Sequence, residues 1–415
     1  MLIRSEKKII IGYDLANTSS QISYCYQKEE SDVETVGTIE GEENYDIPTV
    51  LCKRVGTNQW LFGHAALRFA GEHPEECILV ENLLQLALEG NAVEIDGKGY
   101  HPATLLALFV KRSLSTVAAA RGGDRIRAIM FTSQVLDGRM KALIQRIIRT
   151  LELKNTEIYS QCYEESFFAY LMHQSKSLWS EGAMLLDYRG EDLIAMQMDE
   201  NPHTVPRVMY SNTRRFAFAG TDRELCDIAG PLFEGKQISL VYLIGQKFGG
   251  DWMEESLKLL CTDRRVFQGN NLYSKGACYT ILKRLCPGKE EKEYIFLGPD
   301  KLKANVGMKV QKRGEEAYNA LLDAGMEWTG TEEIVEFYLK GDASLELLVT
   351  PLSKAPGKHV LMELEGLQLE ADQVTRIRMK LTCPAENKIQ ITVNDLGFGE
   401  FRRASDGKWI REVEI

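Results

Sequence analysis

Short runs of apolar residues predict buried β-strands at four places in the chain. Each run is β-branched or leucine-rich and is followed by a polar or glycine-containing turn, as expected of strands covered on both faces. The four runs are residues 9–11, 126–131, 184–186 and 240–244.

Between these runs, apolar residues recur with the period of an α-helix. The clearest stripe has the spacing i, i+3, i+4, i+7, i+8 and predicts a helix over residues 138–150. Its members are Met140, Leu143, Ile144, Ile147 and Ile148. Residues 104–119 and 252–261 are two further candidate helices. The first 288 residues therefore alternate strand and helix, which is typical of an α/β protein.

After residue 288 the pattern changes to a period of two. A charged run over residues 289–293 predicts a linker. Apolar and mostly polar positions then alternate in three segments, 360–364, 377–381 and 389–393, as in antiparallel strands with one buried face. We expect a β-sandwich domain here, with a short helical stretch near residues 314–322.

Charge and cysteine usage narrow the class of protein. The 415 residues include 50 Lys and Arg against 60 Asp and Glu, so the formal net charge is −10 and argues against a nucleic-acid partner. No apolar run approaches the roughly 18 residues of a membrane-spanning helix, and no signal peptide is evident. Nine cysteines without a C-x-x-C pair are typical of reduced thiols. We expect a cytoplasmic protein with no membrane partner.

Two aspartates follow apolar strands and are the main candidates for chemistry, since no Walker A, H-E-x-x-H or G-x-S-x-G signature occurs. Asp14 is followed by Asn17, Thr18 and Ser19, and Asp187 is followed by Gly190. Carboxylates so placed can hold hydrated Mg²⁺ through water, while small residues let backbone N–H groups approach phosphate oxygens. An aspartate at a strand end also simply begins a turn, so neither residue is decisive alone.

The order of these segments resembles that of the actin-like ATPases, in particular the DnaK-type (seventy-kilodalton heat-shock) chaperones. Residues 9–24 and 183–192 resemble the two phosphate hairpins, and 163–170 resembles the connecting helix. Further resembling segments are 47–50 with 62–66, 128–133 with the helix after it, 242–245 with 271–277, and the β-domain segments 331–349, 359–367 and 375–393.

The resemblance implies an α/β actin-like (ribonuclease H-like) two-lobe ATPase domain followed by an antiparallel β-sandwich. The implied parts are lobe I over 1–180, lobe II over 181–288, a linker over 289–298 and a substrate-binding-type sandwich over 299–415. Only about 50 residues separate Asp187 from Leu240, so lobe II lacks the large helical subdomain that clasps adenine in the chaperones.

The resemblance also implies a set of site residues for ATP or ADP with Mg. Asp14 and Asp187 would hold Mg²⁺ through water, and the weak catalytic candidates are Asp14, Asp187, Glu164 and Asp192. The residues that would contact the nucleotide are Asn17, Thr18, Ser19, Gly190, Gly245, Gly249 and Gly250.

The sequence departs from the family where catalysis takes place. Ala16 replaces a hairpin glycine, and Arg189, Glu191 and Asp192 replace two glycines and a threonine of the second hairpin. Two like charges at ~4 Å repel by about 1 kcal/mol in water, so the added carboxylates disfavour a phosphate. Residues 81–85, where the family has a catalytic lysine, contain no basic residue.

These departures favour a chaperone-like protein with a degenerate nucleotide-binding module, in which hydrolysis is weak or lost. Its β-sandwich would bind a peptide or protein segment, and the acidic strand 332–339 would favour basic partners unless it is only a solvated face. The alternatives are an active Mg-dependent ATPase in which Glu164 or Asp192 orients water, an actin-like scaffold that binds no nucleotide, and an actin-like sugar kinase. We expect Trp328, Phe398 and Trp409 to be core residues.

Overall fold

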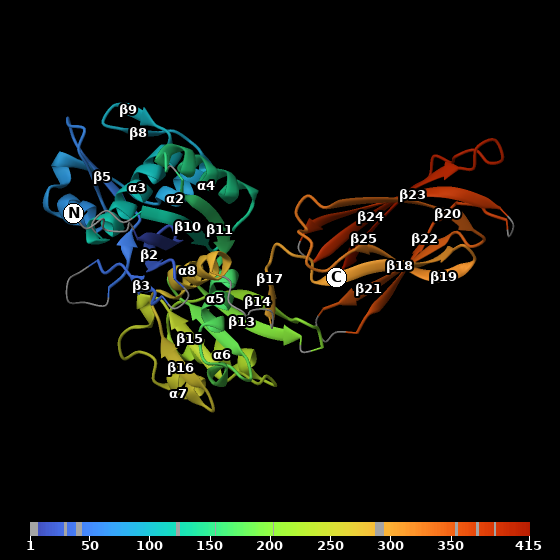
Figure 1. Ribbon diagram of the computed structural model, residues 1–415. Helices are drawn as coiled ribbons and strands as arrows, with labels where there is room; N and C mark the ends of the chain where they lie inside the picture. Colours follow the sequence, from blue (N-terminus) through green and yellow to red (C-terminus); the bar gives the residue numbers. More distant parts are fainter. Residues whose placement is uncertain are drawn as a thin grey trace, which may run out of the picture. The chain divides into compact units, whose positions relative to one another are not determined.

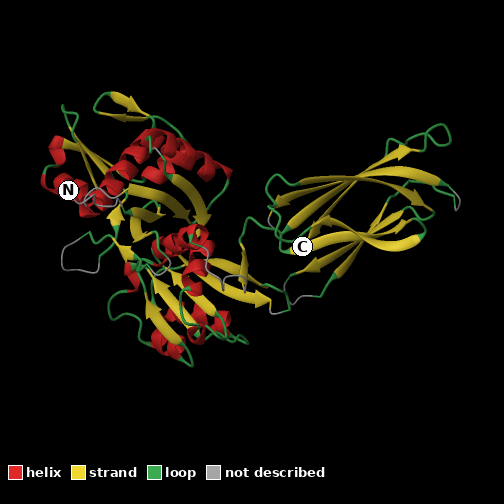
Figure 2. Ribbon diagram, viewed as in Figure 1, coloured by secondary structure: helices red, strands yellow, loops and turns green. Residues whose placement is uncertain are grey.

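The computed structural model describes residues 7–28, 31–38, 44–121, 125–153, 155–201, 203–286, 294–352, 356–370, 373–385 and 387–415 (Figures 1 and 2). The chain forms two units, Met1–Met198 with Asn212–Glu291, and Asp199–Ser211 with Lys292–Ile415. No helix among the described residues is long and apolar enough to cross a membrane. Residues 289–293 of the expected linker lie outside the described residues.

The first sheet contains two of the predicted strands. Its order is β11-β10-β1-β2-β3, and β4 also pairs with β2. β1 is parallel to β10 and antiparallel to β2, so it is covered on both edges. The strands are β1 (Lys8–Asp14), β2 (Ser19–Tyr26), β3 (Glu34–Thr35), β4 (Ile47–Pro48), β10 (Arg125–Ser133) and β11 (Glu157–Cys162).

Helices and two small sheets pack around this first sheet. The predicted helix over 138–150 is confirmed as α4, and Met140, Leu143, Ile144 and Ile147 of its stripe are buried. The helices are α1 (Gly63–Glu72), η1 (Pro74–Glu76), α2 (Leu83–Glu89), α3 (Pro102–Arg121) and α4 (Gly138–Leu151). The small sheets contain β5 (Leu51–Arg54), β6 (Trp60–Phe62), β7 (Cys77–Val80), β8 (Val93–Ile95) and β9 (Lys98–Tyr100).

The second sheet repeats the local arrangement of the first. Its order is β16-β15-β12-β13-β14-β17, with β12 parallel to β15 and antiparallel to β13. The strands are β12 (Ala183–Asp187), β13 (Asp192–Asn201), β14 (Arg207–Ala217), β15 (Leu240–Ile244), β16 (Arg265–Gln268) and β17 (Tyr294–Leu297). Helices α5 (Tyr163–Met172) and η2 (Lys176–Leu178) lie between β11 and β12 in the chain. The helices that follow β14, β15 and β16 are α6 (Asp222–Phe233), η3 (Gln246–Phe248), α7 (Glu255–Cys261) and α8 (Leu272–Leu285).

Strand β17 lies inside the segment that was expected to be the linker, residues 289–298. Tyr294–Leu297, expected to be linker, pair in parallel with β14 from Arg207 to Tyr210. A run of aromatic and aliphatic residues has high strand propensity, and β14 offers it a free edge.

Helix α8 packs closely against both α5 and β1. A Cβ on Gly276 would overlap the carbonyl oxygen of Ser166 in α5, and a Cβ on Gly12 would overlap the carbonyl oxygen of Ser274. The Ser23 and Ser274 hydroxyls share a hydrogen bond of 2.7 Å. Glycine at these contacts lets backbones approach closely, so α8 holds α5 against the strand that ends in Asp14.

The C-terminal unit contains two four-stranded antiparallel sheets, ordered β19-β18-β21-β22 and β20-β23-β24-β25. One buried cluster draws on both sheets, with Leu347 from one and Ile377 and Ile391 from the other. The strands are β18 (Ala304–Lys312), β19 (Glu315–Leu322), β20 (Glu332–Lys340), β21 (Ser344–Pro351), β22 (Lys358–Glu363), β23 (Val374–Ala385), β24 (Lys388–Gly397) and β25 (Lys408–Glu414).

Two expectations for this unit were wrong. Residues 314–322 are not helical: Arg313 and Gly314, with φ of 57° and 88°, form a two-residue turn that pairs β19 with β18. Positive φ at both central residues is the signature of a hairpin turn. Phe398 is 39% exposed and is not a core residue, whereas Trp328 and Trp409 are partly buried against the core.

Candidate functional site

Asp14 and Asp187 occupy equivalent places in the two sheets of the first unit. Each is the last residue of a strand that lies between an antiparallel and a parallel neighbour. Their side chains are buried, with 0% and 4% of the residue surface exposed. Strand pairing therefore places two carboxylates at the ends of two hairpins.

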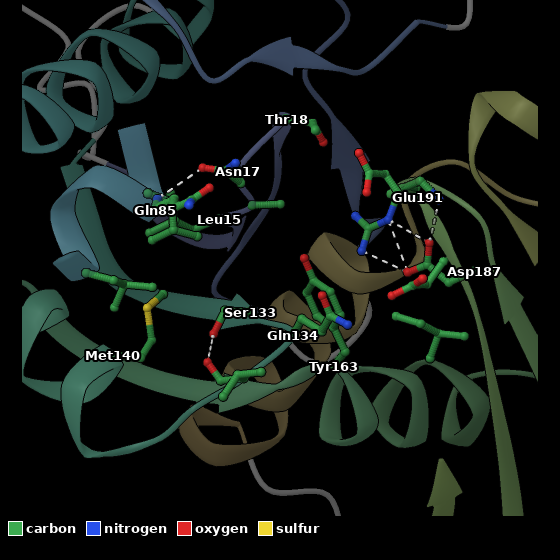
Figure 3. A pocket seen from close by; sticks show the side chains of 18 of the residues that line it. Leu15, Asn17, Thr18, Gln85, Ser133, Gln134, Met140, Tyr163, Asp187 and Glu191 are labelled. Carbon is green, nitrogen blue, oxygen red and sulfur yellow. Dashed lines mark hydrogen bonds and ion pairs between the residues drawn. The ribbon is translucent and has the colours of Figure 1, made fainter. Parts of the chain in front are cut away.

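Arg189 joins these two carboxylates. Its Nη1 donates to Asp14 Oδ2 at 2.7 Å, and its Nη2 donates to Asp187 Oδ2 at 3.0 Å. Its Nε donates to both oxygens of Asp187, at 3.1 and 3.2 Å. Figure 3 shows the ion pair with Asp187 as dashed lines. One guanidinium thus lies between the two aspartates that the sequence singled out.

Two stacked tyrosines complete this group. Tyr163 donates its hydroxyl to Asp14 Oδ1 at 2.6 Å, and Tyr273 donates to Asp187 Oδ2 at 3.1 Å. The two rings stack with their centroids 3.9 Å apart, and the guanidinium carbon of Arg189 lies 4.8 and 4.7 Å from those centroids. Such distances allow cation–π attraction, so we call these five residues the arginine box.

Burial and charge set the protonation of the box. Burial raises the pKa of Asp14, against the opposing effects of the Arg189 charge and the Tyr163 hydrogen bond. Burial by itself lowers the pKa of Arg189, but the carboxylates, Asp187 foremost, raise it well above its usual value. Burial raises the pKa of both Tyr163 and Tyr273. The arginine therefore stays charged and the tyrosines stay hydrogen-bond donors.

The arginine box does not fit a water-bridged Mg²⁺. All four carboxylate oxygens of Asp14 and Asp187 already accept hydrogen bonds from protein donors. Asp14 has no exposed surface and the Arg189 guanidinium lies between the two carboxylates, so a hydrated magnesium ion would first have to displace the guanidinium. In the part of the chain that the structure describes, no three His, Cys, Asp or Glu side chains are grouped as a metal site.

The expected phosphate contacts of the first hairpin have structural partners instead. Asn17 Nδ2 donates to Asn82 Oδ1 at 2.8 Å, and Asn17 Oδ1 accepts from the Gln85 N–H at 3.0 Å. Asn17 therefore bonds to the start of α2. The resemblance to the chaperones implied a catalytic lysine in this segment, which contains no basic residue. The Ser19 hydroxyl donates to Asp46 at 3.2 Å.

A cavity of about 680 Å³ lies beside the arginine box (Figure 3). Among the predicted site residues, its lining includes Asn17, Thr18, Asp187, Gly190 and Asp192. Glu164 lies in a smaller adjoining cavity of about 210 Å³, where Thr213 donates to its Oε1 at 3.1 Å.

Three of the four glycines expected at the nucleotide, Gly245, Gly249 and Gly250, do not line this cavity. Gly245 has φ of 117°, and a Cβ there would lie 2.6 Å from the Tyr188 carbonyl oxygen. The tight turn after β15 explains this glycine without a ligand. Gly249 and Gly250 follow η3, and Gly250 has φ of 89°.

Comparison with known proteins gives a family but no activity. Residues 32–299 match "Family of unknown function (DUF5716) C-terminal", which covers more than half of the chain. The chain belongs to the DUF5716 family. Residues 301–415 of this DUF5716 protein match "Domain of unknown function (DUF8552)". No curated protein matches the chain.

The sequence contained the parts of the arginine box but not their assembly. Arg189 was recognised as a departure from glycine, and Tyr163 fell in the expected connecting helix. Tyr273 lies 110 residues after Tyr163, and no local pattern in a DUF5716 sequence pairs the two. The usable signal was an arginine two residues after one of two strand-end aspartates.

Proposed function

We propose that this protein is a degenerate relative of the actin-like chaperones, in which the first unit serves as a scaffold without Mg-dependent ATP turnover. The arginine box carries the proposal. Arg189 supplies, from within the chain, the positive charge that Asp14 and Asp187 would otherwise take from a hydrated metal ion. A guanidinium bonded to both carboxylates also competes with a phosphate-bound metal for the same space.

The strand order supports the actin-like part of this proposal. In both sheets, an aspartate ends a strand that continues through a hairpin and is flanked by a parallel strand. Paired hairpins of this kind, with α5 and α8 packed together beside them, agree with the family order of segments read from the sequence.

The C-terminal unit would bind a peptide or protein segment. Strand β20 lies at the end of its sheet, so a partner strand could pair with its outer edge. Its acidic residues do not favour a basic partner, because Glu336 pairs with Arg378 at 2.7 Å and Glu332 pairs with Lys380 at 2.6 Å. Recognition would then rest on backbone pairing and on exposed side chains such as Ile334 and Tyr338.

We also propose a cytoplasmic location. The nine cysteines are free, which suits a reducing compartment.

The test is calorimetry and thermal shift of the full chain with ATP or ADP, with and without Mg²⁺, followed by phosphate release. We expect no Mg-dependent stabilisation, whereas an ATPase held at 100 times its Kd would gain about 2.7 kcal/mol. If the parent chain releases phosphate from ATP, and this release is lost in Asp14→Asn and Asp187→Asn, the proposal is overturned. Release lost in Glu164→Gln or Asp192→Asn would favour the rewired ATPase.

A further inference from the structure

The cavity beside the arginine box has the size of a small-molecule site. Its volume of about 680 Å³ falls within the range of ordinary ligand pockets, roughly 300–1,000 Å³. All of its lining residues belong to the first unit. Figure 3 shows Met140, Leu15 and Gln85 on one side and Asp187 and Glu191 on the other.

One wall of the cavity is apolar. Leu84 and Leu88 of α2 line it together with Met140, at the start of α4. The other apolar residues of the lining are Leu15, Ala16, Val135 and Ile194. Polar side chains such as Gln85 also line the cavity, so the apolar residues are the part of the lining that suits a hydrocarbon or aromatic body.

Acidic residues outnumber basic residues in and around the cavity. Five acidic residues border the cavity, its smaller neighbour or the arginine box: Asp14, Asp187, Glu191, Asp192 and Glu164. Three basic residues face the same region: Arg189, Arg215 and Lys247. The formal net charge of these eight residues is therefore 3 − 5 = −2.

The basic groups are already engaged by the protein. Each of the three guanidinium nitrogens of Arg189 donates to Asp14 or Asp187. Arg215 donates to Asp192 at 3.3 Å, and Lys247 donates to the Gly190 carbonyl at 2.6 Å. These contacts offset part of the positive charge that an incoming anion would meet, although Arg215 and Lys247 keep further N–H groups.

Glu191 differs from these paired residues. It is exposed, lines the cavity, and makes no ion pair with any of the described residues. A carboxylate at the mouth of an apolar cavity attracts an ammonium group whose hydrocarbon part can enter the cavity.

We propose that this cavity binds a small organic cation, namely an amine with an apolar body, and that Glu191 contacts its ammonium group. The apolar body lies against Leu88 and Met140. The proposal concerns ligand class and does not rest on the chaperone-like function.

The test uses three probes of equal length that differ in head-group charge: hexylammonium, hexanol and hexanoate. Their binding to the full chain is measured by ligand-observed NMR and by chemical shifts of the Met140 methyl group. We expect hexylammonium to bind at least about tenfold more tightly than hexanoate. Hexanoate or inorganic phosphate that binds as tightly as hexylammonium would contradict the proposal, and so would the absence of binding by all three probes.

Two variants locate the site. Glu191→Gln should weaken hexylammonium several-fold and leave hexanol unchanged, because only the charge is lost. Leu88→Trp should weaken both probes by filling the cavity. Glu181→Gln is the matched control, since Glu181 is exposed and does not line the cavity. Binding unchanged in both Glu191→Gln and Leu88→Trp would overturn the assignment. ATP plays no part in these measurements, so failure here is distinguishable from failure of the proposed function.

Discussion

The Arg189 guanidinium lies 2.7 Å from the Asp14 carboxylate, although 175 residues separate them in the chain. Because Arg189 also pairs with Asp187, it connects the hairpin after β1 with the hairpin after β12. The Asp14 side chain has no exposed surface, and that of Arg189 is 16% exposed. A cation built into the chain thus neutralises the carboxylates in place of a bound ion.

Removing that cation should destabilise the first unit. Arg189→Ala leaves two buried carboxylates without their partner, and breaking a buried ion pair from one side costs about 3–5 kcal/mol. Urea unfolding of the full chain measures the change. Arg139→Ala is the control, because Arg139 is 79% exposed and pairs with Asp137, so its loss should change stability by less than about 1 kcal/mol.

Methylguanidinium should partly restore the stability of Arg189→Ala. The space left by the side chain keeps two carboxylates and two tyrosine faces around it. Thermal shift at millimolar methylguanidinium should raise the midpoint of the variant and leave the parent protein unchanged. Equal shifts in both proteins would mean that the box does not recognise a guanidinium.

Gly276→Ala should destabilise the packing of α8 on α5. The added Cβ would overlap the Ser166 carbonyl, and overpacking of this kind costs about 1–3 kcal/mol. Gly71→Ala in α1 is the matched control: its Cβ meets nothing within 4 Å, so we expect a gain of about 0.5–1 kcal/mol. Paired denaturation curves measure both changes. A neutral Gly276→Ala would show that α8 can shift away from α5.

Asp222 should titrate at unusually low pH. The Ser256 side chain beside its carboxylate, together with hydrogen bonds from the N–H groups of Glu255, Ser256 and Glu254, lowers its pKa to about 2. Since the unfolded value is about 3.9, the ionised group stabilises the fold above pH ~4 and this contribution disappears as pH falls through about 2. Carboxyl ¹³C NMR measures the midpoint, and Asp222→Asn identifies the resonance. A midpoint near 4 would contradict the contacts at the start of α7.

Asp395 should be essential to the loop between β24 and β25. It accepts from the Thr375 hydroxyl, from the Gly397 and Ser405 N–H groups at 3.0 Å, and from Arg402 at 3.2 Å. Burial opposes ionisation, but these hydrogen bonds lower the pKa of Asp395.

Asp395→Ala therefore leaves the partly buried Arg402 without its carboxylate partner, and we expect a loss of about 3–5 kcal/mol. Hydrogen exchange of the amides in β23 and β24 of the full chain measures it. The control is Glu346→Ala, which removes only an exposed contact with His359 and should change stability by less than about 1 kcal/mol. Equal protection in both variants would show that the loop is held by other contacts.

The elements that the sequence predicted well are those with a strong local pattern. The apolar stripe of α4 has a buried residue at each turn of the helix. The runs at 184–186 and 240–244 form β12 and β15, which are buried along their length. The helix expected from residue 252 begins instead at Glu255. Asp222, about 30 residues earlier in the chain, accepts hydrogen bonds from the first N–H groups of α7 and fixes its start.

The sequence by itself determined that Asp14 and Asp187 end buried strands and that the charged residues Arg189 and Glu191 follow Asp187. Those facts follow from local periodicity and residue type, which act over a few residues. The tertiary structure decided that Arg189 faces both carboxylates, that Tyr163 stacks on Tyr273, and that an apolar cavity lies beside them. The contacts of Arg189 with Asp14 and of Tyr163 with Tyr273 join segments 100 or more residues apart, and their geometry depends on how two sheets and two helices pack.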